Sequence, residues 1–136
     1  MILVIALLAC SSSYELGVGN KCDSLNIFQI SNFDVLPYPP IGCSPQSISM
    51  TGKFDADAAP THFHIYETHN FRQRYDQNIE VTNGPFTPGQ TQTFNFNFNP
   101  HWCDSGNYRI QISLVKEDGD SHQYTHYSCW QYEYSL

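Results

Sequence analysis

The sequence predicts an all-β protein, an immunoglobulin-like antiparallel β-sandwich of about seven strands. No window of useful length has the periodicity of an amphipathic helix, whereas apolar and polar residues alternate in several windows. Clusters of Gly, Pro, Asn and Asp separate those windows, as turn residues separate the strands of a sandwich. Aromatic residues make up 15% of the chain and charged residues only 14%, which favours packed β-structure over disorder.

Seven windows define the expected strands, and turn residues separate them. In chain order, the strands are expected at 27–35, 47–54, 62–66, 71–81, 93–99, 108–114 and 123–134. The first strand ends at the Pro-rich segment 37–40, and the fourth ends before Asn83-Gly84-Pro85, because proline cannot donate to a ladder of hydrogen bonds. Asp118-Gly119 is typical of a tight hairpin and joins the last two strands.

Alternation also assigns one set of side chains to a buried face. Phe94, Phe96 and Phe98 alternate with asparagines, which is typical of a strand with one dry face and one wet face. The same period of two adds further inward-facing residues in the other strands: Ile48, Met50, Phe63, Ile65, Tyr108, Ile110 and Ile112. In most sandwiches, residues of this kind fill the core between the sheets.

Residues 1–13 are expected to form a signal peptide, and residues 14–136 the folded domain. The run 1–9 is apolar but too short to span a bilayer, and small residues follow it. Leu7-Leu8-Ala9-Cys10 leaves open a bacterial lipobox with a lipidated cysteine, and a retained, buried first segment is a third alternative. Export predicts that the protein is secreted or lies in the lumen of an endolysosomal compartment.

The cysteines agree with export. Removal of the leader with Cys10 leaves Cys22, Cys43, Cys103 and Cys129, an even number that predicts two disulfides in an oxidising compartment. Their spacing alone leaves all three pairings open. No Cys-x-x-Cys motif occurs, so zinc or thioredoxin chemistry is not expected.

Charge and motifs exclude several classes of function. Thirteen acidic against six basic residues give a formal charge of −7, which does not suit a protein that binds nucleic acid. His62 and His64 share one face of a strand, and imidazole binds zinc. Glu67 and His69 are close in sequence and could add ligands. However, His62 and His64 lie on the other face of the strand from Phe63, so they are expected at the surface. No nucleophile motif such as Gly-x-Ser-x-Gly occurs, so we expect no catalytic residue, metal or cofactor.

Three segments carry a resemblance to a known family. They are Cys22 with the strand and Pro-rich turn that lead to Gly52, then Pro100-His-Trp102 with 105–110, and finally Asp118-Gly119 with Cys129-Trp130. In this order they resemble the ML lipid-recognition family, which includes ganglioside activators and the Niemann-Pick type C cholesterol carrier. Because the first and last cysteines pair in that family, the resemblance implies a Cys22–Cys129 disulfide. The remaining pair would be Cys43–Cys103, which departs from the family's usual local pairs.

The resemblance implies a non-enzymatic protein that holds a lipid between its two sheets. The lipid would contact the inward-facing residues Ile48, Met50, Phe63, Ile65, Phe94, Phe96, Phe98, Tyr108, Ile110 and Ile112. Tyr38, Pro39 and Ile41 of the Pro-rich loop would form the mouth of the cavity, unless this loop is only a rigid turn. The expected ligands are a sterol, fatty acid, phospholipid or glycolipid, collected during transient contact with a membrane.

A second hypothesis is a non-enzymatic interaction sandwich. Such a protein would bind a protein partner through a sheet edge or through a Tyr-rich surface. Tyr124, Tyr127, Tyr132 and Tyr134 alternate imperfectly, so the sequence leaves open whether they cover a sheet surface or fill the core. A dry, fully packed interior would favour this hypothesis over a lipid carrier.

Overall fold

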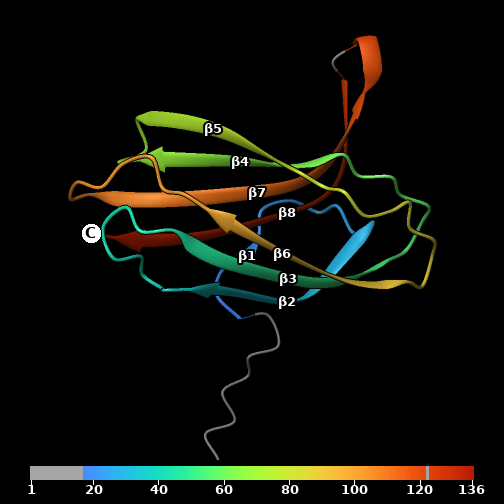
Figure 1. Cartoon of the computed structure of the whole chain (residues 1–136), viewed down its shortest axis with the longest axis horizontal. Helices are drawn as coiled ribbons and strands as arrows, with labels where there is room; N and C mark the ends of the chain where they lie inside the picture. The colour runs from blue at the N-terminus through green and yellow to red at the C-terminus, as the bar shows by residue number, and fades with distance from the viewer. Residues whose placement is uncertain (1–16, 122) are drawn as a thin grey trace, which may run out of the picture.

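The computed structural model describes residues 17–121 and 123–136, which form two facing antiparallel sheets (Figure 1). The strands are β1 (Asn20–Lys21), β2 (Phe28–Leu36), β3 (Gln46–Phe54), β4 (His62–His69), β5 (Gln73–Glu80), β6 (Thr91–Phe98), β7 (Asn107–Asp118) and β8 (Gln123–Ser135). One sheet has the order β1-β8-β7-β4-β5 and the other the order β2-β3-β6. The predicted β-sandwich is confirmed, and within the described residues the two-residue β1 is added to the seven predicted strands. The expected signal peptide, 1–13, lies outside the described residues.

The alternating sequence places the core between the sheets. In β3, every second residue from Gln46 to Phe54 is buried, and β6 supplies the buried Phe94 and Phe98 from the neighbouring strand. β4 and β7 face them with Phe63, Ile65 and the apolar side of β7. A period of two buries one face of each strand, as expected for stacked sheets.

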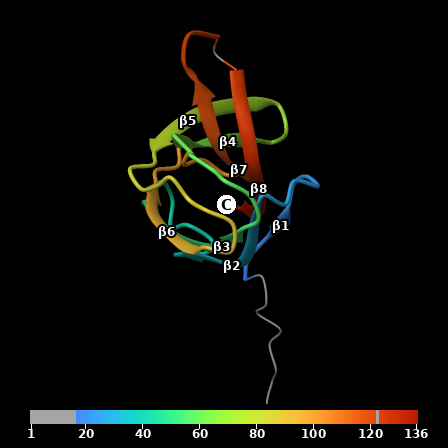
Figure 2. The same cartoon turned by 90° about the vertical axis from the view of Figure 1, so that its right-hand side faces the viewer.

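The β7–β8 hairpin is the longest pair of strands and projects beyond the sandwich (Figures 1 and 2). The short 3-10 helix Gly119–Ser121 turns the chain at its tip, next to the predicted Asp-Gly position. The β7–β8 ladder is irregular at one point, where Leu114 pairs with Ser128 but Val115 pairs with His126. Tyr127 is the extra residue of this β-bulge, and it changes which side of β8 faces the core.

Both disulfides expected for the chain are present. Cys22–Cys129 joins the segment after β1 to β8, with a Cα–Cα distance of 5.2 Å. Cys43–Cys103 joins the β2–β3 loop to the β6–β7 loop, with a Cα–Cα distance of 4.7 Å. Two disulfides are consistent with an oxidising location, secreted or lumenal. Within residues 17–121 and 123–136, no helix has the length and apolarity needed to cross a bilayer.

Candidate functional site

The residues predicted to contact lipid do converge between the sheets. Nine of them are buried: Ile48, Met50, Phe63, Ile65, Phe94, Phe98, Tyr108, Ile110 and Ile112. Phe96 is partly buried and packs against the same core. The structure therefore brings together residues from both sheets, as alternation predicts.

These side chains touch one another across the two sheets. The ring of Phe63, from β4, stacks on Phe96 of β6 at 4.5 Å between ring centroids and meets Phe94 edge-on at 5.2 Å. Towards one end of the sandwich, Phe54 stacks on Phe86 at 4.5 Å. Ring contacts of this length are those of a packed core. A lipid held between the sheets would first have to separate these rings.

Three hollows on the described part of the chain have volumes of about 350, 340 and 310 Å³. The first lies over β2, β3 and β6 and is lined by Asp34, Leu36, Ser47, Ile48, Ser49, Asn95, Phe96 and Asn97. The second is lined by Asp57, Ala58, Ala59, Pro85, Phe86, Thr87, Lys116 and Tyr127, and the third by Phe71, Asn107, Tyr108, Glu133, Tyr134 and Ser135. Of the ten predicted lipid contacts, only Ile48, Phe96 and Tyr108 line any of the three.

The predicted cavity mouth is an exposed loop with large apolar side chains. Ile41 is 78% exposed and Tyr38 is 44% exposed, and Pro39 is exposed beside them. Leu36, at the end of β2, is 70% exposed and adds a residue that the sequence did not single out. We call residues 36–41 the apolar loop. These exposed side chains place several apolar groups close together on one surface.

The apolar loop is anchored to the sandwich at several points. The Tyr38 hydroxyl donates a hydrogen bond to the carbonyl oxygen of Glu133 at 2.6 Å. The side-chain amide of Gln46 donates to the carbonyl oxygen of Pro37 at 2.8 Å. Just after the loop, Cys43 forms the disulfide with Cys103 of the β6–β7 loop. The loop is therefore an anchored turn with exposed apolar side chains, and its role as the mouth of a lipid cavity stays a prediction.

Beneath this loop, the core changes from phenylalanine to polar aromatic side chains. Tyr132 and Tyr134 are buried, and the Tyr132 hydroxyl donates to the Gln46 side-chain oxygen at 2.8 Å.

Tyr127 is also buried, so that only Tyr124 of the four C-terminal tyrosines is exposed, at 40%. A surface rich in these four tyrosines therefore does not form, because three of them fill the core.

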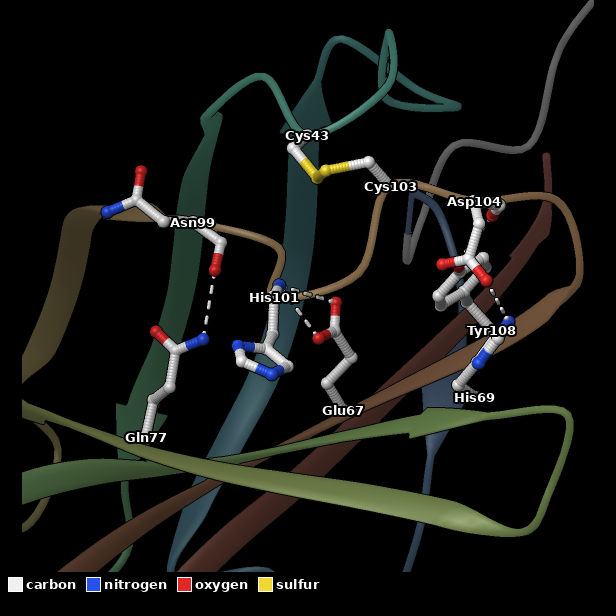
Figure 3. The surroundings of a disulfide bond; sticks show 9 residues. All are labelled: Cys43, Glu67, His69, Gln77, Asn99, His101, Cys103, Asp104 and Tyr108. Carbon is white, nitrogen blue, oxygen red and sulfur yellow. Dashed lines mark hydrogen bonds and ion pairs between the residues drawn. A yellow bond between two sulfur atoms is a disulfide. The ribbon is translucent and has the colours of Figure 1, made fainter.

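A buried carboxylate lies at the same end of the sandwich and was not predicted as part of a site. Glu67 accepts hydrogen bonds from the backbone N–H of His101 at 2.8 and 3.2 Å (Figure 3). Burial raises the pKa of the Glu67 carboxyl, and the backbone hydrogen bonds from His101 and Trp102 partly offset that rise. Glu67 has the same phase in β4 as Phe63 and Ile65, so alternation alone indicates that it points inward.

The histidines and acids of β4 do not form a joint metal site. Glu67 and His69 face the interior, whereas His62 and His64 lie on the outer face of the same strand. In the part of the chain that the structure describes, no three His, Cys, Asp or Glu side chains are placed to hold a metal ion. The expected surface position of His62 is wrong in one respect, since this residue is only 8% exposed. The projecting hairpin places Tyr124 edge-on against it, at 5.7 Å between ring centroids.

Comparison with known proteins gives a likeness in fold. No family model matches the chain, and no curated protein matches it. Among solved structures, the chain is similar to the C-terminal domain of Wzt, with a TM-score of 0.63 and 14% sequence identity. The similarity covers 86% of this chain and 74% of that one. At this identity, the likeness shows a shared β-sandwich fold.

Proposed function

We propose that the protein is an exported, non-enzymatic lipid-binding protein that makes contact with lipid through its apolar loop. The observation that carries the proposal is the exposure of Ile41, at 78%, and Leu36, at 70%, beside the half-exposed Tyr38. The free energy falls when water-exposed aliphatic side chains of this size enter an apolar phase. A lipid surface provides such a phase without requiring a complementary protein shape.

The anchored loop favours this contact energetically. The hydrogen bonds of Tyr38 and Gln46 and the Cys43–Cys103 disulfide hold the loop in place before binding, so little conformational entropy is lost on contact. Full burial of one Leu or Ile side chain contributes roughly 1.5–3 kcal/mol, so Leu36 and Ile41 together contribute roughly 3–6 kcal/mol before the costs of association. Binding of this strength is reversible, as a carrier or lipid sensor requires.

Charge directs the proposal towards neutral lipid. The apolar loop contains no charged residue, and the whole chain has a formal charge of −7. An anionic membrane would repel a protein of this charge at neutral pH. A bilayer of zwitterionic lipid exposes the same apolar interior without that repulsion.

Two experiments test the proposal. Vesicles of phosphatidylcholine should float the wild-type protein, and the double variant L36D/I41D should stay with the soluble fraction. The control L25D/Y124D adds the same two charges at exposed apolar positions outside the loop, of which Leu25 is 38% and Tyr124 is 40% exposed. Equal flotation of the two double variants, or no flotation of the wild type, would reject the apolar loop as the lipid contact.

Lipid held between the sheets is a separate part of the proposal. It requires the rings of Phe63, Phe94 and Phe96 to move apart, so it predicts a second conformation of the core. Mass spectrometry of organic extracts from the natively purified protein would detect such a lipid. A stoichiometric lipid supports a carrier with a core that opens, whereas a lipid-free protein that still floats would be a surface-binding lipid sensor.

A protein partner is the second candidate function, and the outer face of β4 favours it. There Arg74 lies over the Tyr66 ring at 3.7 Å, and Tyr124 covers His62 from the projecting hairpin. Tyrosine and arginine are enriched where proteins recognise one another. Loss of a purified complex in a Tyr124→Ala variant, with flotation unchanged, would support this candidate.

A further inference from the structure

The edge strand β5 offers a row of backbone groups with no neighbouring strand. In the described residues β5 is the last strand of its sheet, and it pairs on one side only, with β4 (Figure 2). All eight of its residues are exposed or partly exposed. Unpaired N–H and C=O groups along such an edge are a template for another strand.

β5 carries charged side chains, but it lacks three other features by which proteins protect an edge: proline, lysine and a bulge. It contains no proline and no lysine, and its eight residues pair with β4 without a bulge, from Gln73 to Glu80. The opposite edge of the same sheet is β1, which has only two residues. In the second sheet, the edge strand β2 is partly covered, because the Val18 N–H donates a hydrogen bond to the Phe33 carbonyl oxygen. The remaining edge strand, β6, contains no charged residue. β5 therefore combines a long open edge with charges that select a partner.

We propose that two copies of the chain associate through β5, so that their five-stranded sheets form one continuous antiparallel sheet around a twofold axis at Gln77. A closed twofold dimer needs a surface that is complementary to itself. Antiparallel pairing about Gln77 places Arg74 of one copy opposite Glu80 of the other, and does so twice. It also places Asp76 opposite Asn78, so no two like charges face each other.

The inner face of β5 fits the same register. Tyr75 would face Ile79 of the second copy, again twice, which is an aromatic–aliphatic pair of the kind that stabilises neighbouring strands. Tyr75 is already held flat against the β6–β7 loop, since its ring stacks on His101 at 3.8 Å with an interplanar angle of 5°. The Tyr75 side chain is therefore already ordered on this face before a second copy pairs.

Antiparallel pairings of β5 that are centred on neighbouring residues are less favourable. Centring the pair on Asp76 would place Asp76 against its own copy, and centring it on Asn78 would place Asp76 against Glu80. Centring it on Tyr75 would pair Arg74 with Asp76 but would leave residues 78–80 of β5 outside the ladder. Only the Gln77 register among these four uses most of the strand and avoids like charges.

The outer side of the edge is prepared for the Arg74–Glu80 contact. Arg74 donates hydrogen bonds to Asp76 through Nε at 2.7 Å and Nη2 at 3.1 Å, and lies over the Tyr66 ring at 3.7 Å. These contacts hold the guanidinium on the outer face of the sheet. Arginine has five N–H donors, so it is able to bond a second carboxylate beside the first.

Sedimentation and native mass spectrometry of the oxidised chain test the association. We expect a concentration-dependent dimer, whose dissociation constant rises about tenfold in E80R and in R74E, because each variant places like charges opposite each other twice. The double variant R74E/E80R should recover most of the loss, since the charges are exchanged across the axis. D120R, at the exposed hairpin tip, makes the same change in net charge as E80R and should leave the dimer unchanged.

A cysteine at the axis locates the contact directly. In antiparallel pairs, facing Cα atoms lie about 4.5–5.5 Å apart, within the range that a disulfide spans. Q77C should therefore form a covalent dimer under oxidising conditions. N78C should not, because residue 78 of one copy faces residue 76 of the other and the two cysteines would not face each other. Peptide mapping would show that the two native disulfides are intact. A monomer at every concentration, or a dimer that E80R leaves unchanged or that Q77C does not cross-link, would overturn the proposal.

Discussion

Both carboxylate oxygens of Glu67 accept the backbone N–H of His101, at 2.8 and 3.2 Å, inside the sandwich. The contact joins β4 to the β6–β7 loop, two residues before Cys103 (Figure 3). A further hydrogen bond from the Gln77 amide to the Asn99 carbonyl, at 2.9 Å, holds the start of the same loop. The loop that contains Cys103, the partner of Cys43, is thus held from inside by the Glu67 carboxyl group and from outside by the disulfide.

Glu67 should make stability depend on pH in an unusual direction. Its pKa is raised above the ordinary 4.5, chiefly by burial, so the folded state holds the proton more tightly than the unfolded state. Ionisation therefore costs the folded state free energy, and the contribution of Glu67 to stability falls as pH rises from about 4.5 through the raised pKa. E67Q, which carries no charge, should gain stability relative to the wild type over that range. Urea unfolding of both proteins at several pH values checks this, and parallel stability curves would contradict it.

The Cys43–Cys103 disulfide should contribute strongly to stability. It links residues 60 positions apart, for which the chain-entropy model gives about 4 kcal/mol. C43S/C103S should lose about that amount in the free energy of unfolding, measured with denaturant, and should also bind vesicles less well because the apolar loop loses an anchor. Removal of Cys22–Cys129, with a separation of 107, should cost slightly more but leave flotation intact. Equal loss of flotation in both variants would assign the effect to global unfolding.

The Phe63 ring should behave as a core residue. It is 2% exposed and contacts Phe94 and Phe96 across the sheets, so Phe63→Ala should destabilise the protein by about 3–5 kcal/mol. Phe71, which is 58% exposed, is the matched control and should change the free energy of unfolding by only about 1 kcal/mol or less on substitution by Ala, since the contact of its ring with Arg109, at 5.0 Å, is exposed. Thermal or denaturant unfolding measures both. A small effect at Phe63 would indicate that the interior is already loosely filled.

Acidification should strengthen association with anionic membranes. The chain has a formal charge of −7 with its six histidines neutral, and lowering the pH from about 7 to about 5 protonates histidines and part of the carboxylates. The repulsion from anionic lipid then weakens, and flotation on vesicles that contain phosphatidylserine should increase. Vesicles of phosphatidylcholine alone are the control and should respond less. The same bound fraction at both pH values on the anionic vesicles would reject this electrostatic account.

The strands of the sandwich were predictable because one face of most of them is apolar in a strict period of two. Phe94, Phe96 and Phe98 in β6 are the clearest case, and their register with β3 agrees with the predicted faces. The last strand was harder to predict. The bulge at Tyr127 shifts its phase, so that Tyr124 is exposed whereas Tyr132 is buried. The imperfect alternation of the tyrosines was the trace of that bulge, but only pairing with β7 resolves it.

Glu67 illustrates a second limit of the sequence. Its phase in β4 indicates an inward side chain, yet a carboxylate is rarely buried without partners. Those partners come from His101 and Trp102, which are more than thirty residues away in the chain and reach Glu67 only through the fold. The burial of His62 has the same kind of cause, because Tyr124 reaches it from the tip of a distant hairpin.

By itself, the sequence determined which side chains face inward, since the period of two follows from the geometry of an extended strand. Whether those inward faces enclose a space or fill it was decided only by the tertiary structure. The Phe63 ring reaches Phe96 of the opposite sheet at 4.5 Å. The separation of the sheets depends on the volumes of side chains that meet from distant strands, and the pattern along one strand carries no information about that sum.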